Sequence, residues 1–244
     1  MSFANLWSAE IIKFRTLRSY LITVIASIAV AGIAAAFVGT GVDAKGNIPG
    51  MGTSIQAVAF PMEVVIYAMM VLGVLIATGD LRSGTFRITS IMSPWRRQVL
   101  TAKFTAAAVI ALGVGVVSTV LAYVGGLLTG GSGYSPLSGD GGLLVLATLI
   151  AVPLATILGT AVGLLLRSTA GAVALLLVWA LGIEAIFAYT VPPMVVAFLP
   201  FKTVGAAVAN LPLGPLPGLG MFTLYVAIAT GLAIFVYERR DLGT

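Results

Sequence analysis

The residues that could carry chemistry in this chain gather in one polar stretch, residues 79–103, between two long apolar runs. Of the thirteen lysines and arginines in the chain, five fall in this stretch, together with a single acid, Asp80. The five are Arg82, Arg87, Arg96, Arg97 and Lys103. Asp80 is well placed to cap a helix and Pro94 to end it, so we expect a surface helix at about 80–93. Its positive face would suit non-covalent docking of a partner. The alternative is a charge cluster that only fixes orientation in a membrane, which needs no capped helix.

Glu63 and Glu184 are the acids that lie clearly inside apolar runs. An ionisable group in hydrocarbon is costly and normally faces a bundle interior or a wet cavity, so each is a candidate for a substrate path or a proton site. The alternative is a carboxyl that is protonated or hydrogen-bonded near the outer surface and serves the fold alone.

Other chemistry is excluded by composition. The chain has no cysteine and no histidine, which removes disulfides, thiolate or imidazole metal sites and the usual nucleophile–base pairs. No Gly-x-x-x-x-Gly-Lys-Ser/Thr run occurs, so a nucleotide phosphate would have to be held by another polypeptide. Carboxylate sites remain possible, with only eight acids to build them. The net charge of +5 reflects the basic cytoplasmic face of a membrane protein and does not call for nucleic acid.

The elements that must position these residues are membrane spans. Hydrophobic residues make up 59% of the chain and charged residues 9%, far below the roughly 25% of soluble proteins. Each apolar run is about 20 residues or longer, which is the length of a transmembrane helix and too long for a cleavable signal peptide. We expect an all-α integral membrane protein, a single domain over residues 1–244, with six spans. They are predicted at 20–39, 56–78, 104–128, 142–166, 170–190 and 217–237.

The distribution of basic residues predicts the orientation. If the N-terminus is inside, eleven basic residues lie in cytoplasmic segments and only Lys45 and Lys202 lie outside. Both termini are then cytoplasmic, and the chain is a multi-pass protein of the cell membrane. In the fourth span, Gly159 and Gly163 are four residues apart and predict close approach of a neighbouring helix.

Residues 1–19 precede the first span and read as an amphipathic helix. Apolar residues recur there at three- and four-residue spacing, which suits a helix lying in the membrane interface. The basic residues Lys13, Arg15 and Arg18 are suited to anionic headgroups.

Residues 191–216, before the last span, are apolar but rich in proline, so they cannot form one spanning helix. We expect two short helices near 194–200 and 202–210 that enter the outer leaflet and return. Such backbone persists only against protein or water. A lid over a translocation path and an interfacial loop remain equal alternatives.

Two motifs resemble the membrane subunits of type 2 ATP-binding-cassette (ABC) permeases in their small, stand-alone bacterial form. The first runs Glu10-Ile11-Ile12-Lys13-Phe14-Arg15-Thr16-Leu17-Arg18-Ser19, similar to the elbow helix of that family. The second runs Asp80-Leu81-Arg82-Ser83-Gly84-Thr85-Phe86-Arg87, followed by Pro94-Trp95-Arg96-Arg97 and Ala102-Lys103. Asp80 stands where the family usually has glutamate. The order of elbow, six spans and re-entrant pair is also similar over essentially the whole chain.

The resemblance implies a dimer of six-span subunits, formed with an identical chain or a paralogue, bound to two copies of a separate ATPase that holds ATP and Mg²⁺. It also implies no enzyme activity, no metal and no cofactor in this chain. The expected substrate is amphipathic or hydrophobic (a drug, antibiotic, peptide or lipid) and moves outward. The elbow residues are Glu10, Lys13, Arg15 and Arg18. The residues implied in ATPase coupling are Asp80, Arg82, Gly84, Thr85, Arg87, Pro94, Arg96 and Arg97. An ion-coupled carrier using Glu63 and Glu184, and a membrane anchor or sensor without transport, are the alternatives.

Overall fold

The computed structural model describes residues 3–49, 52–82, 96–209 and 213–239. These residues are almost entirely helical, with one two-stranded antiparallel hairpin among them that pairs Asn47 with Thr53. In chain order the elements are α1 (Phe3–Thr16), α2 (Arg18–Gly39), β1 (Asn47–Ile48), β2 (Gly52–Thr53), α3 (Gln56–Arg82), α5 (Arg96–Thr129), the 3-10 turn η1 (Gly131–Gly133), α6 (Gly141–Leu166), α7 (Thr169–Leu177), the π-helical η2 (Val178–Ile183), α8 (Glu184–Thr190), α9 (Pro193–Val196), α10 (Pro200–Ala209) and α11 (Pro215–Arg239).

Within the described ranges, six helical segments are long and apolar enough to cross a membrane. They are Arg18–Gly39, Gln56–Asp80, Arg97–Thr129, Gly141–Leu166, Thr169–Thr190 and Pro215–Arg239. The predicted all-α fold with six helices long and apolar enough to span a membrane is thereby confirmed. The third span departs most from its predicted bounds, because α5 has 34 residues. At 1.5 Å per residue this is about 51 Å, longer than the roughly 30 Å hydrocarbon core.

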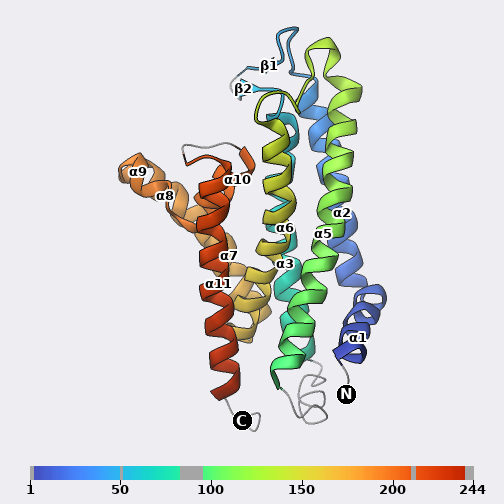
Figure 1. Cartoon of the computed structure of the whole chain (residues 1–244), viewed down its shortest axis with the longest axis vertical. Helices are drawn as coiled ribbons and strands as arrows, with labels where there is room; N and C mark the ends of the chain where they lie inside the picture. The colour runs from blue at the N-terminus through green and yellow to red at the C-terminus, as the bar shows by residue number, and fades with distance from the viewer. Residues whose placement is uncertain (1–2, 50–51, 83–95, 210–212, 240–244) are drawn as a thin grey trace.

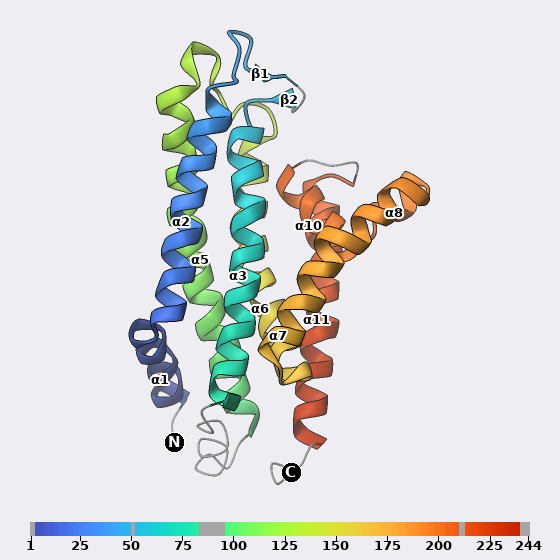
Figure 2. The same ribbon diagram turned by 180° about the vertical axis from the view of Figure 1, so that it is seen from behind.

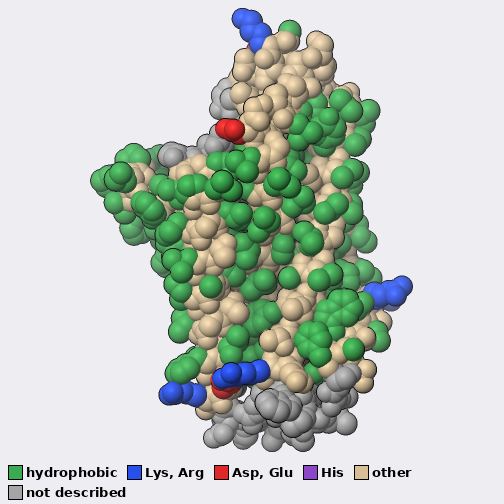
Figure 3. All heavy atoms as spheres, viewed as in Figure 1, with side chains coloured by type: hydrophobic (Ala, Val, Ile, Leu, Met, Phe, Trp, Pro, Cys, Tyr) green, Lys and Arg blue, Asp and Glu red, His purple; other side chains and the backbone are tan. Residues whose placement is uncertain are grey.

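The helices form an elongated bundle with two distinct ends (Figure 1). The start of α1, the end of α3, the start of α5 and the end of α11 lie together at one end, which we call the terminal end. The β1–β2 hairpin and the α5–α6 connection lie at the other, which we call the hairpin end. Between the two ends the visible side chains are mainly hydrophobic, interspersed with backbone and small polar groups, and lysines and arginines lie towards the ends (Figure 3). This is the distribution expected of lipid-facing helices with polar ends.

The centre of the bundle is the contact between α3 and α6, where the backbones approach closely. A Cβ atom on Gly159 would lie 1.9 Å from the carbonyl oxygen of Met70, and one on Gly73 would lie 2.1 Å from the carbonyl oxygen of Thr156. Only glycine is compatible with this spacing, which confirms the close approach predicted at Gly159 and Gly163. Fully buried side chains surround it, including Met62, Ile66, Met69 and Leu72.

The fifth span, formed by α7, η2 and α8 in succession, leans away from the rest of the bundle towards the hairpin end (Figures 1 and 2). The chain then makes two short helices, α9 and α10, close to where the proline pattern predicts them. α10 packs against α11 and α6. In Figure 1, α10 lies beside the half of the bundle that is nearer the hairpin end.

The prediction that Asp80 caps the start of a new helix was wrong. Asp80 lies in the last turns of α3, which continues to Arg82. Its Oδ2 is bonded to Lys13 and Lys103. Residues 83–93 of the helix predicted at about 80–93 lie outside the described residues.

Candidate functional site

Four charged side chains meet at the terminal end and form what we call the ionic clasp: Glu10 of α1, Lys13 of α1, Asp80 of α3 and Lys103 of α5. The Lys13 ammonium lies 2.8 Å from Glu10 Oε1 and 2.9 Å from Asp80 Oδ2. The Lys103 ammonium lies 2.5 Å from Asp80 Oδ2 and 3.1 Å from Glu10 Oε2. Each ammonium therefore contacts both carboxylates, and three helices are joined through one ring of charges.

The Asp80 and Lys103 side chains of the clasp are buried, whereas the Glu10 and Lys13 side chains are 13% and 28% exposed, and the four formal charges cancel. Lys103 is 1% exposed and Asp80 7% exposed, and Lys103 also donates to the carbonyl of Ile76 at 3.3 Å. Buried ions are tolerated only when they are paired and hydrogen-bonded, and here each has two partners of opposite charge. Burial by itself would lower the pKa of Lys13, but the attraction of Glu10 and Asp80 outweighs it and the pKa lies above its ordinary value. Lys13 accordingly stays protonated in its place between the two acids.

Local sequence explains why these side chains converge. Glu10 and Lys13 are three residues apart, so they share one face of α1. Leu6, on the same face, packs against Val99 and Ala102 of α5. Lys103 follows Val99 by one helical turn, and this places its ammonium beside Glu10. The backbone of Leu17 is extended (φ −84°, ψ 112°), which separates α1 from the first span and lets it lie against the bundle.

Further polar bonds tie the remaining helices at the same end. The hydroxyl of Tyr20 in α2 donates to the carbonyl of Leu75 in α3 at 3.1 Å. Thr169 of α7 donates to Thr78 of α3 at 2.8 Å.

An ion pair links α5 to the last helix at the terminal end. The guanidinium of Arg97 pairs with the carboxylate of Glu238 in α11, with Nη2 at 3.1 Å from Oε2. With the clasp and the bonds of Tyr20 and Thr169, side-chain contacts at this end thus reach α1, α2, α3, α5, α7 and α11.

The structure places the residues predicted for ATPase coupling in three groups. Asp80 is buried in the clasp, and Arg97 is exposed and paired with Glu238. Arg82 ends α3 and Arg96 begins α5. Gly84, Thr85, Arg87 and Pro94 lie outside the described residues.

Of the predicted elbow residues, Glu10 and Lys13 face the bundle, whereas Arg15 and Arg18 are exposed.

Sequence reasoning placed Lys103 in the polar stretch and in the second motif but gave it no role, and it did not single out Tyr20. The signal that could have found Lys103 is the apolar character of its helical neighbours, Val99 and Ala107, which are four residues to either side. A lysine on an apolar helical face needs a buried acid, and Asp80 is the acid of that stretch.

A second polar site lies towards the hairpin end, where Glu184 caps helix α10. Glu184 is 0% exposed, and its Oε1 accepts the backbone N–H of Phe201 at 2.9 Å and the indole N–H of Trp179 at 3.2 Å. The backbone N–H of Lys202 also acts on this carboxylate. A carboxylate at a helix N-terminus satisfies free N–H groups and complements the helix dipole. Glu184 Oε2 has no hydrogen-bond partner among the described residues.

The π-helix before Glu184 explains the bond from Trp179. Residues five apart align along a π-helix, in which hydrogen bonds run from residue i to i+5. Trp179 and Glu184 are five residues apart, and η2 occupies Val178–Ile183. The wider turn therefore brings the indole beside the carboxylate, an alignment that an α-helix would not give.

Glu63, the other acid within a span, lies near the same helix end. It is half-buried and accepts a hydrogen bond from Tyr67 at 3.1 Å. The Tyr67 ring in turn packs against Phe201, with ring centroids 6.2 Å apart. Glu63 and Glu184 both act electrostatically on the Tyr67 hydroxyl. The two acids that the sequence singled out thus come together around the first turn of α10.

In the part of the chain that the structure describes, no three acidic residues gather in a way that could hold a metal ion. The clasp can transmit force between helices, and the Glu184 site can hold or release α10.

Comparison with known proteins adds no relative: no protein-family model matches the chain, and no characterised protein matches its sequence. The fold and the two sites define an all-α, six-span membrane protein whose helices are tied at the terminal end by a buried ionic clasp.

Proposed function

We propose that this chain is the membrane-spanning permease subunit of an ATP-binding-cassette exporter of type 2. It would move an amphipathic or hydrophobic substrate outward, with ATP hydrolysed by a separate ATPase subunit. The observation that supports this most is the position of the clasp. Asp80 and Lys103 lie on either side of residues 83–95 and are bonded to each other. Each is also bonded to α1, Asp80 through Lys13 and Lys103 through Glu10.

The position of the clasp suggests how a force applied to residues 83–95 would reach the helices. A partner docked on residues 83–95 would pull on the end of α3 and the start of α5. Because the clasp joins both helices to α1, the three would move as one body, and α2 would follow through its bond from Tyr20. Closure of an ATPase pair is then a ligand-driven bias on a two-state bundle. α1 serves as the elbow helix in this proposal.

The remaining parts of the proposal follow the charge distribution. In this proposal the terminal end faces the cytoplasm. Two copies of the ATPase bind there and hold ATP and Mg²⁺. A second permease subunit, either an identical chain or a paralogue, completes the translocation pathway. Residues 191–216 form the re-entrant segment on the outer side. The packing of α10 against α6 and α11 supports this, since backbone that enters a membrane and returns must be covered by protein.

The proposal predicts that an ATPase travels with this chain. Tagged chain isolated from its native membrane should bring down a soluble polypeptide with a nucleotide-binding loop, identified by mass spectrometry. Gly84→Pro and Arg87→Glu should each remove most of it, because both alter the docking stretch. Lys45→Glu, a charge reversal near the β1–β2 hairpin, is the matched control and should retain it. Recovery of the intact wild-type chain without any ATPase would refute the proposal.

An ion-coupled carrier is the second candidate, favoured by the convergence of Glu63 and Glu184 around α10. Glu63→Gln and Glu184→Gln would then abolish transport, while deletion of the ATPase would leave it intact. Transport that survives both substitutions but is lost when the ATPase is deleted supports the exporter.

A further inference from the structure

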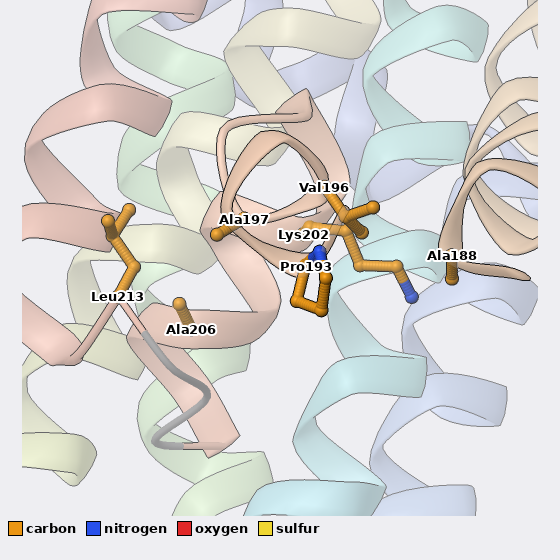
Figure 4. Close-up of a pocket in the computed structure, with 7 residues that line it drawn as sticks. All are labelled: Ala188, Pro193, Val196, Ala197, Lys202, Ala206 and Leu213. Atoms are coloured by element: carbon orange, nitrogen blue, oxygen red, sulfur yellow. The ribbon is translucent and has the colours of Figure 1, made fainter. Parts of the chain in front are cut away.

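A small pocket opens between α8, α9 and α10, next to the helix that Glu184 caps (Figure 4). Its volume is about 140 Å³. Ala188 of α8, Pro193 and Val196 of α9, and Ala206 of α10 give it apolar walls. The charged side chain among its lining residues is that of Lys202. The pocket therefore combines one cation with an otherwise apolar surface.

The Lys202 side chain extends from α10 towards Ala188 of α8 (Figure 4). In the described part of the chain its ammonium makes no hydrogen bond or ion pair. The acid that acts on it electrostatically is Glu184, whose Oε1 is already held by the backbone of α10 and by Trp179. The positive end of the α10 dipole is also satisfied by this carboxylate. An incoming anion would accordingly meet the Lys202 ammonium and not the helix end.

We propose that this pocket binds an anionic amphiphile, with its carboxylate or phosphate on Lys202 and its apolar part against Ala188, Pro193 and Val196. An ammonium beside hydrocarbon is costly unless an anion pairs with it, and a ligand of this class supplies both the anion and the apolar contact. The inference rests on the proposed export function and narrows its substrate class.

The size of the pocket limits how much of the ligand it holds. A cavity of about 150 Å³ accommodates a benzene molecule, so this pocket takes one ring or a short alkyl segment. The rest of the molecule would lie outside, along the apolar surfaces of α8 and α9, where Phe187 and Met194 are exposed.

Binding to the purified full-length chain in nanodiscs of zwitterionic lipid tests this without ATP or ATPase. The probes are radiolabelled dodecyl phosphate and dodecanoate, with dodecanol as the uncharged counterpart and empty nanodiscs as background. We expect both anions to bind above background, and Lys202→Gln to weaken them about tenfold or more, the loss of a hydrogen bond to a charged group. Lys202→Arg should retain binding, and the matched control Lys45→Gln should leave it unchanged. Binding of only one anion would assign the headgroup.

A second variant tests the same proposal if Lys202→Gln fails to fold. Ala188→Trp places a large ring at the exposed edge of the pocket and leaves Lys202 in place, so it should also reduce anion binding. Equal binding of dodecanol and the anions, or anion binding that neither variant reduces, would overturn the proposal. Because no ATPase is involved, such a failure leaves the pull-down result untouched, and the two proposals fail separately.

Discussion

Replacing Lys103 with methionine is expected to destabilise the folded chain by about 3–5 kcal/mol, the cost of removing one partner from a buried ion pair. Lys103 is 1% exposed and is the closest cation to Asp80. Without it, Asp80 and Glu10 would face each other with Lys13 alone between them. The measurement is the fraction of detergent-solubilised chain that stays monodisperse after heating.

The ring of charges also predicts how this loss can be reversed. In the double variant Lys103→Met with Asp80→Asn, the remaining pair of Glu10 and Lys13 is again neutral, so much of the lost stability should return. Such coupling is the signature of residues in one network. Lys45→Met, at an exposed position, is the control. A Lys103→Met chain as heat-resistant as this control would show that the clasp does not hold the terminal end together.

Replacing Gly159 with alanine is expected to be strongly destabilising, although the change adds a single methyl group. That methyl would lie 1.9 Å from the carbonyl oxygen of Met70. Overpacking commonly costs about 1–3 kcal/mol. Here the obstacle is backbone in the neighbouring helix, so we expect the upper end of that range or beyond and poor accumulation in the membrane.

Gly113 in α5 provides the matched control for this substitution. A Cβ atom there would meet nothing within 4 Å. Gly113→Ala should therefore be neutral or slightly stabilising, because alanine favours a helix over glycine by about 1 kcal/mol. If the two alanine variants had the same stability, α3 and α6 would not pack as closely as described.

The sequence was sufficient to predict the spans, because each is an uninterrupted apolar run long enough for a bilayer. It also indicated the close contact at Gly159 and Gly163, since small residues at a spacing of four permit close approach. The start of α5 was placed eight residues too late: polar residues such as Arg97 and Lys103 continue the helix beyond the apolar run, and hydropathy alone does not detect this.

The clasp could not be predicted because it depends on how separate helices pack. Glu10, Asp80 and Lys103 are far apart in sequence, and each has a plausible surface role by itself. Asp80 in particular read as a helix cap, and its true partners appear only when α1 folds back on α5. The Glu184 cap was hidden for the same reason: it needs the π-helical turn that aligns Trp179 and the later return of α10.

The central claim, that ATP hydrolysed by a partner moves this bundle, can be measured directly because the chain contains no cysteine. A single cysteine at Ala188, on the edge of the pocket between α8, α9 and α10, is labelled with a membrane-impermeant maleimide in the purified complex with the proposed ATPase. Tyr189→Cys, at a position 91% exposed, is the control for reagent access. We predict that MgATP changes the labelling rate at position 188 severalfold and leaves that at 189 unchanged. Equal rates at position 188 with and without MgATP, in a complex that hydrolyses ATP, would contradict the account.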